Sequence, residues 1–535
     1  MITDNSGIAK SEVLPIGVSP GESAEQGLSS KAIDPNEKHL STDHLLSDLK
    51  GRTVSSAFIT TAAQGAQFVL NLGSIMVLAR LLTPQDFGLV AMVTTIAGFL
   101  RIFEGAGLYT ATVQREGITH AQVSNLFWTN VALGGTISLV LAFSAPAVAW
   151  FYREPRLVGL TLALCVTFLP NSSAVQHLAI LKRQMQFKMI AVIQVSSAAA
   201  GALVGIGMAW LNCRYWSLVG LQLSAAIVTV LSAWSASRWR PQLPRRCSGT
   251  WSLLSFGANL SASSLLWCLA RGCDGLLIGR FYGSAPLGLY SRAAALVSRP
   301  VEQFMSPLEA VFLPTLSRLQ AQPERYRRIV LQVYETVAVA SFPLSGLLLA
   351  LSHPLTLVVL GPKWGSAAPI FAGFTLIALY TPIAGITGWM LTSQCRGRDF
   401  LLQSVISSSV TVVAFLLGLP FGPAGVALAY SLCCILILLP LLYYIVGRKG
   451  PVTTRDLWSR FFRHLPLWGI VCGSTFLLQR LVSSFVPWAQ LLVCGSAGLL
   501  IAASFVCIYP RARRTALELF AVLRDWRKAR NMVTI

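Results

Sequence analysis

Residues 124–150, SNLFWTNVALGGTISLVLAFSAPAVAW, form a run of 27 residues that contains no charged side chain. A helix needs about 20 mostly apolar residues to cross the hydrocarbon core of a bilayer, so this run predicts a transmembrane helix. Similar stretches recur along the whole chain. We count fourteen of them, near residues 57–82, 87–112, 124–150, 157–181, 189–211, 216–236, 253–278, 287–315, 329–351, 368–392, 401–418, 424–446, 465–485 and 489–509.

The composition agrees with a membrane protein. Hydrophobic residues make up 54% of the chain and charged residues only 12%, whereas soluble proteins have about 25% charged residues. The mean hydropathy is +0.63. The sequence therefore predicts an all-α polytopic membrane protein with about 14 transmembrane helices. Membrane lipids are expected partners, and nucleic acid is not, although the formal net charge is +21.

The positive charges are distributed unevenly between the two predicted faces of the membrane. Of the 42 Lys and Arg residues, 31 fall in the two tails and in the loops on the same side as the tails. Seven fall on the opposite side and four lie inside predicted spans. Because basic residues concentrate in cytoplasmic loops, this pattern predicts that both termini are cytoplasmic.

The two tails and the cysteines contain no predicted functional site. Residues 1–50 are polar and lack an apolar run, so we predict a disordered cytoplasmic tail there. Residues 511–535 form a basic cytoplasmic tail, which is either an amphipathic helix on the membrane surface or an ordinary solvated segment. The eleven cysteines form no C-x-x-C pair, so neither a disulfide framework nor a metal site is predicted.

A short repeat at an offset of 200 residues suggests an internal duplication. LARLL at 78–82 followed by FGL at 87–89 corresponds to IGRFY at 278–282 followed by LGL at 287–289. Six spans separate the copies, so both halves enter the membrane in the same sense, as in transporters with parallel repeats. The predicted domains are an N-terminal six-helix bundle at 51–247, a second bundle at 248–447 and two appended helices at 448–510.

Charged residues inside the predicted spans are the candidate functional groups. Arg-x-x-acid pairs, whose members share a helix face, occur three times: Arg101 with Glu104, Arg271 with Asp274, and Arg299 with Glu302. A charge at bilayer depth costs a few kcal/mol, so such residues normally face a bundle interior or a wet cavity. We expect these residues either to line a polar lumen or to form ion pairs that hold helices together.

The span at 287–315 carries the largest group of charges. Arg292, Arg299, Glu302 and Glu309 recur at spacings that place them on one stripe roughly 100° wide. Arg292 has no acid three or four residues later, which makes it the best candidate for contacting an anionic cargo group. The numbers of basic and acidic residues inside the spans balance, so counting alone does not predict a cationic cavity.

The first predicted span has a polar face as well. Gln64, Gln67 and Asn71 occur at helical spacing. Such a face suits a hydrophilic lumen, although amides also join neighbouring helices by hydrogen bonds. We favour the lumen, because the next span carries Arg101 and Glu104.

Two absences bear on function. The chain has no G-x-x-x-x-G-K-[ST] loop for nucleotide phosphates and no H-E-x-x-H zinc motif. The loops between spans are also too short to hold a catalytic domain. The sequence therefore predicts a non-enzymatic protein without a cofactor.

The run ARLLTPQDFGLVAM at 79–92 closely resembles the start of the Wzx-type (WzxC-like) polysaccharide flippases of the multidrug/oligosaccharidyl-lipid/polysaccharide exporter superfamily. Further segments resemble the family in the same order, and together they cover roughly residues 55–450. They are DGLLIGR at 274–280, LGLYS at 287–291, FLPTLSRLQ at 312–320 and GPKW at 361–364.

The resemblance implies two six-helix bundles that face each other, plus two extra helices. It also implies a bacterial cytoplasmic-membrane flippase that moves polyprenyl-pyrophosphate-linked oligosaccharide outward by alternating access. The polymer served would be exopolysaccharide, capsule or O-antigen, including lipopolysaccharide. The implied partners are the lipid-linked oligosaccharide and other polysaccharide assembly proteins.

Other functions remain open from the sequence. A cation-coupled multidrug exporter shares the superfamily fold but needs an apolar, acid-lined cavity, so Arg101 and Arg299 argue against it. A membrane-embedded polymerase or glycosyltransferase would normally need a large loop with catalytic acids. A non-transporting scaffold of a polysaccharide assembly complex would tolerate neutral replacements of Arg292 and Arg299.

Overall fold

The computed structural model describes residues 49–101, 104, 106–115, 117–244 and 272–508, and every regular element within these ranges is a helix. The predicted all-α fold is therefore confirmed for this part of the chain. The tails predicted at 1–50 and 511–535 lie almost wholly outside the described residues, as does most of the span predicted at 253–278.

The first half of the chain forms a group of helices that pack on one another. α7 packs along α8 and α1, while α4 packs along α5 and α6, and α6 also contacts α8. The elements of this half are α1 (Leu49–Leu81), α2 (Pro84–Arg101), α3 (Ala106–Gln114), α4 (His120–Tyr152), α5 (Leu157–Cys165), α6 (Phe168–Arg183), α7 (Phe187–Trp210) and α8 (Trp216–Ser237).

The second half begins with helical residues 272–282 and forms another group. α10 and α11 both pack along α14, α15 packs along α16, and α18 joins the group by packing along α11. The elements are α10 (Ser284–Arg318), α11 (Pro323–Ala350), α12 (Ser352–Val359), η3 (Pro362–Ala367), α13 (Ala368–Phe374), α14 (Ile377–Ser393), α15 (Gly397–Gly418), η4 (Leu419–Phe421), α16 (Gly422–Cys433), η5 (Cys434–Leu438), α17 (Leu439–Gly447), α18 (Thr454–Leu481) and α19 (Pro487–Ile508).

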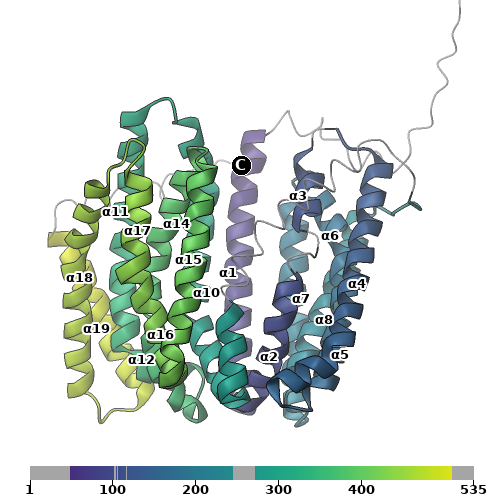
Figure 1. Cartoon of the computed structure of the whole chain (residues 1–535), viewed down its shortest axis with the longest axis horizontal. Helices are drawn as coiled ribbons and strands as arrows, with labels where there is room; N and C mark the ends of the chain where they lie inside the picture. The colour runs from purple at the N-terminus through teal and green to yellow at the C-terminus, as the bar shows by residue number, and fades with distance from the viewer. Residues whose placement is uncertain (1–48, 102–103, 105, 116, 245–271, 509–535) are drawn as a thin grey trace, which may run out of the picture.

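The two groups stand side by side, with α1 between them (Figure 1). We call the side that holds the start of α1 the upper side and the side that holds its end the lower side, as they are drawn in Figure 1. The strongest connection between the groups is the packing of α2 against α10. These two helices therefore form most of the contact between the halves.

Nine helices in the described part of the chain are long and apolar enough to cross a membrane, and a tenth is formed if the bent pair Pro362–Phe374 and Ile377–Ser393 is one span. The protein is thus a multi-pass membrane protein, but the predicted count of fourteen is not confirmed. Four differences account for the gap between fourteen and ten. Most of the span predicted at 253–278 lies outside the described residues. The helical stretch Gly397–Gly447 counts once, although α15 folds back along α16 and so covers two predicted spans. The predicted span 87–112 is divided into α2 and α3. α10 is long enough to cross a membrane but is less apolar than the helices counted above.

Local sequence explains where several helices begin. Thr119 and Thr453 accept hydrogen bonds from the backbone N–H groups of Gln122 and Asp456, whose side chains bond back to the cap residues. These are capping boxes, which satisfy backbone donors that a helix start leaves free. Gly361 precedes η3 with φ of +102°, a conformation that a residue with a Cβ rarely adopts.

The largest buried cluster connects the two halves. It includes Leu78 of α1, Phe87 and Met92 of α2, Tyr290 of α10 and Trp364 of η3. Because hydrophobic burial is weak as a driving force between helices in lipid, close packing of such side chains is what holds this region together. The halves pack most closely near the lower side, where the end of α1 and the starts of α2 and α10 meet.

Candidate functional site

α10 carries its charged residues mostly on an exposed face, opposite the face that packs against other helices. Its buried residues recur at Tyr290, Ala293, Val297, Val301 and Met305, which lie on one side of the helix. The charges predicted to form a stripe fall on the opposite side. Of these, Arg299, Glu302 and Glu309 are exposed, whereas Arg292 is half-buried.

Arg299 and Glu302 share a helix face, and we expected them either to line a lumen or to form ion pairs. Among the described residues no ion pair joins them, and both side chains are exposed. A spacing of three residues permits the contact, but the two side chains do not form an ion pair in this structure. The two groups are therefore available to other partners.

Arg292 has no carboxylate partner in the described structure, as the absence of an acid three or four residues later suggested. Its Nε is buried and has no hydrogen-bond partner. The guanidinium carbon lies 5.1 Å from the centre of the Phe87 ring on α2, close enough for a cation–π interaction. Its net charge is not neutralised by any carboxylate in ion-pair contact within the described ranges.

Arg101 and Glu104 do meet, as predicted, but loosely. Arg101 Nε lies 3.8 Å from Glu104 Oε2, and the Arg101 side chain is 54% exposed while that of Glu104 is only 6% exposed. Ser172 Oγ on α6 donates a hydrogen bond of 3.1 Å to Glu104 Oε1. The Arg101 guanidinium also lies over the ring of Phe168, 5.7 Å from its centre. The acid is thus held in the first group of helices while the arginine reaches outward.

Asp274 has a partner that sequence reasoning missed. Tyr290 Oη on α10 donates a hydrogen bond of 2.9 Å to Asp274 Oδ2, and the backbone N–H of Gly275 donates to Oδ1. The predicted partner Arg271 lies outside the described residues. No local spacing could have identified Tyr290, because it is 16 residues away and on another helix.

The polar residues of α1 differ in exposure. Gln64 and Gln67 are half-buried and Asn71 is exposed. α1 packs along α7 and contacts α10 only slightly. Asn71 therefore points away from the packed core, and the hydrogen-bonding role considered for all three residues does not apply to it within the described structure.

The two halves meet at a pair of glycines near the lower side. A Cβ added to Gly88 of α2 would lie 1.7 Å from the carbonyl oxygen of Ser284 on α10. A Cβ added to Gly288 of α10 would lie 1.9 Å from the carbonyl oxygen of Pro84 on α2. Positions 84 and 284 differ by the 200-residue offset of the sequence repeat, as do 88 and 288. The contact is therefore reciprocal, and only glycine fits at its two centres.

A second contact on the lower side joins the end of α1 to η3. Trp364 Nε1 donates a hydrogen bond of 2.8 Å to the carbonyl oxygen of Ala79, and Trp364 is fully buried. Arg80 Nη2 donates to the carbonyl oxygen of Val358 at 2.8 Å, and Lys363 Nζ donates to the Arg80 carbonyl oxygen at 3.3 Å. The sequence flagged the GPKW segment as a motif, but its contact with α1 spans almost 300 residues and has no local signal.

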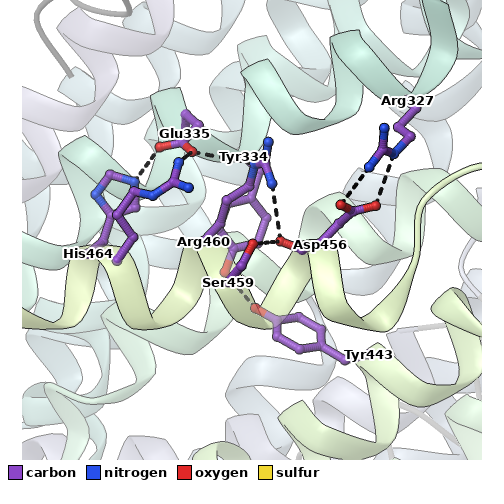
Figure 2. Close-up of polar contacts among 9 residues, drawn as sticks. Arg327, Tyr334, Glu335, Tyr443, Asp456, Ser459, Arg460 and His464 are labelled. Atoms are coloured by element: carbon purple, nitrogen blue, oxygen red, sulfur yellow. Dashed lines mark hydrogen bonds and ion pairs between the residues drawn. The ribbon is translucent and has the colours of Figure 1, made fainter. Parts of the chain in front are cut away.

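On the upper side, α18 is tied to α11 by ion pairs (Figure 2). Arg327 donates two hydrogen bonds, of 2.7 and 3.0 Å, to the two oxygens of Asp456. Glu335 accepts from Arg463 at 2.8 Å and pairs with His464 at 2.5 Å. These groups satisfy one another, which indicates a structural link. Among the described residues no group of His, Cys, Asp and Glu could hold a metal ion.

Comparisons with known proteins place the chain in a family. The profile of the family described as polysaccharide biosynthesis protein matches residues 77–369, more than half of the sequence. This chain belongs to that family. The lipopolysaccharide biosynthesis protein WzxC of Escherichia coli (strain K12) is 23% identical over 78% of this chain and 86% of its own length. The teichuronic acid biosynthesis protein TuaB of Bacillus subtilis (strain 168) is 30% identical over 66% of this chain and 72% of its own length.

A solved structure supports the fold of this polysaccharide biosynthesis protein. The lipid II flippase MurJ in an inward closed conformation superposes with a TM-score of 0.66, covering 84% of this chain and 99% of the flippase. The sequence identity is 13%, so this likeness shows the fold alone. The family resemblance noted in the sequence is confirmed by the profile and by both relatives.

Proposed function

We propose that this protein is a flippase that moves polyprenyl-pyrophosphate-linked oligosaccharide across the bacterial cytoplasmic membrane. The product would feed the synthesis of exopolysaccharide, capsule or O-antigen, and the protein would act as a transporter without catalysing a covalent step. The observation that carries the proposal is the exposed charged face of α10, which lies above a tight contact between the two halves. Membership of the polysaccharide biosynthesis family supports it.

The charged face of α10 suits a hydrated path for a polar head group. Exposed charges such as Arg299, Glu302 and Glu309 are costly in hydrocarbon, so they require water or polar cargo beside them. The planar guanidinium of Arg can bind pyrophosphate oxygens through two parallel hydrogen bonds. Arg292 lies one helical turn above Gly288 and offers a buried, unpartnered Nε at the lower end of this face. The residues that we propose to line the path are Arg101, Arg292, Arg299, Glu302, Glu309 and Asn71. We propose that a second set lies beside the path and orients these residues: Glu104, Asp274, Gln64, Gln67 and Arg271.

We assign the upper side to the cytoplasm, and the excess of basic residues in the loops on that side supports this assignment. Both termini would then be cytoplasmic, and the contacts at Gly88, Gly288 and Trp364 would close the periplasmic end. Two six-helix bundles, at 51–247 and 248–447, would rock relative to each other, with helices 448–510 appended to the second. Transport by alternating access requires that these lower contacts separate once cargo has entered from the cytoplasm.

Arg299→Ala tests the assigned path. We expect this variant to abolish polymer export while its amount in the membrane stays normal, because an exposed side chain is lost without creating a cavity. Arg318→Ala is the matched control, since Arg318 is also an exposed arginine of α10 but lies in its last turn. Export would be measured as surface polymer in a strain that carries only the variant. Normal export by an Arg292→Ala, Arg299→Ala double variant would remove arginine from the mechanism and favour a scaffold.

A further inference from the structure

An apolar groove lies on the surface of the first group of helices, between α4, α6 and α8. It encloses about 440 Å³. Its walls are formed by Trp128 and Val131 of α4, Leu169 of α6, and Ile227 and Leu231 of α8. Leu169, Ile227 and Leu231 are 49%, 43% and 64% exposed, so the groove opens outward to the surrounding bilayer. Its helices pack mainly on one another and on α5 and α7, away from α10.

Arg240 stands at the upper end of this groove, and a second arginine, Arg238, lies two residues before it in the chain. α8 ends at Ser237, and Arg238 and Arg240 follow it with exposed side chains. The Arg240 guanidinium lies 5.5 Å from the ring centre of Trp234, which lines the groove, and Nη1 donates to the Trp234 and Trp239 carbonyl oxygens. In the described part of the chain neither arginine is paired with a carboxylate. Their charges are therefore uncompensated.

The segment that carries these arginines is fixed against α4. Trp128 Nε1 donates a hydrogen bond of 2.8 Å to the Gln242 carbonyl oxygen, and the Gln242 N–H donates to Ser124 Oγ at 3.1 Å. The His120 ring lies 3.1 Å from the Arg240 carbonyl oxygen. Pro241, within this segment, also lines the groove. The cationic end and the apolar channel thus form one structure.

We propose that this groove binds one anionic phospholipid of the leaflet on the upper side, which the function proposed above makes the cytoplasmic leaflet. An acyl chain would lie along α8 between Trp234 and Ile227, a length of about 10 Å at the helical rise per residue. The phosphate would contact Arg238 and Arg240. Basic pockets beside transmembrane helices are the usual place where anionic head groups bind, and each arginine strengthens such binding about fivefold.

The binding test uses the purified full chain and does not depend on transport. Native mass spectrometry would count lipids retained from detergent doped with phosphatidylglycerol, with phosphatidylcholine of the same acyl chains, or with undecaprenyl phosphate. We expect preferential retention of one phosphatidylglycerol. The Arg238→Gln, Arg240→Gln double variant should weaken retention about 25-fold, the product of two fivefold effects. The control is Arg398→Gln, which replaces an exposed arginine on the same side of the membrane and should leave retention unchanged.

A second pair of variants tests the groove itself. Ile227→Trp would fill the channel and should abolish the preference, whereas Leu203→Trp changes a side chain that is 74% exposed on α7 and outside the groove. Equal retention of the two phospholipids, or undiminished retention by the double arginine variant, would overturn the proposal. Retention of undecaprenyl phosphate but not of phosphatidylglycerol would overturn it too, and would assign the groove to a polyprenyl carrier.

Discussion

Replacing Gly88 by alanine should disrupt the closed lower side of the protein. The new Cβ would lie 1.7 Å from the Ser284 carbonyl oxygen, whereas Cβ atoms essentially never approach another heavy atom within 3.0 Å. The backbones of α2 and α10 must therefore separate by more than 1 Å at this point. Overpacking of this kind typically costs about 1–3 kcal/mol. Because the cost falls only on the state in which the two helices touch, that state should lose a factor of about 5–150 in population.

Disulfide cross-linking measures this population. Arg80→Cys and Lys363→Cys, in a background without native cysteines, place thiols on the two segments that meet on the lower side. Gly88→Ala should slow their oxidative cross-linking by a factor within the range above. Gly98→Ala is the matched control, because Gly98 lies on the same helix and its added Cβ would meet nothing within 4 Å. Both substitutions gain the same helix propensity, so that effect cancels. Equal cross-linking rates in the two variants would refute the glycine contact as the element that allows closure.

Three further substitutions test other contacts. Trp364→Phe should lower the free energy of unfolding by about 1–3 kcal/mol, because a buried carbonyl oxygen at the end of α1 loses its donor; an unchanged thermal unfolding midpoint would contradict this. Arg327→Asp should loosen the link between α11 and α18, and Asp456→Arg should cost less stability in that background than in the wild-type chain, a comparison in which its loss of the Thr453 capping box cancels; equal costs in the two backgrounds would show that the charges do not act together. Tyr290→Phe should remove the hydrogen bond that Tyr290 donates to Asp274 and cost about 1–3 kcal/mol in the same assay, and wild-type stability would show that the hydrogen bond contributes nothing.

Features that depend on helical periodicity were predictable from sequence. The spacing of Arg292, Arg299, Glu302 and Glu309 placed them on one face, and the structure leaves that face of α10 unpacked. Most of the predicted spans also correspond to observed helices, since length and apolarity are local properties. α10 is not counted among the apolar membrane spans, because the charges that make it a candidate functional helix lower its mean hydropathy.

Features that depend on tertiary contacts were not predictable. The donors to Glu104 and Asp274 come from Ser172 and Tyr290, which are distant in sequence. The spacing of Arg299 and Glu302 permitted an ion pair but did not require one, and in the structure their side chains do not pair. The repeat did mark Gly88 and Gly288 as equivalent positions, yet only the packed helices reveal that they touch the opposite backbone.

The most direct test of the proposed flippase activity is the leaflet in which polyprenyl-linked oligosaccharide accumulates when this protein is absent. Spheroplasts of a deletion strain would be treated with an external glycosidase, and the protected and cleaved lipid-linked units would be quantified. A flippase defect predicts an excess of unpolymerised units that are protected from the enzyme, and re-expression of the chain should remove it. Units that still reach the outer leaflet and are cleaved as in the parent strain would contradict the proposed function.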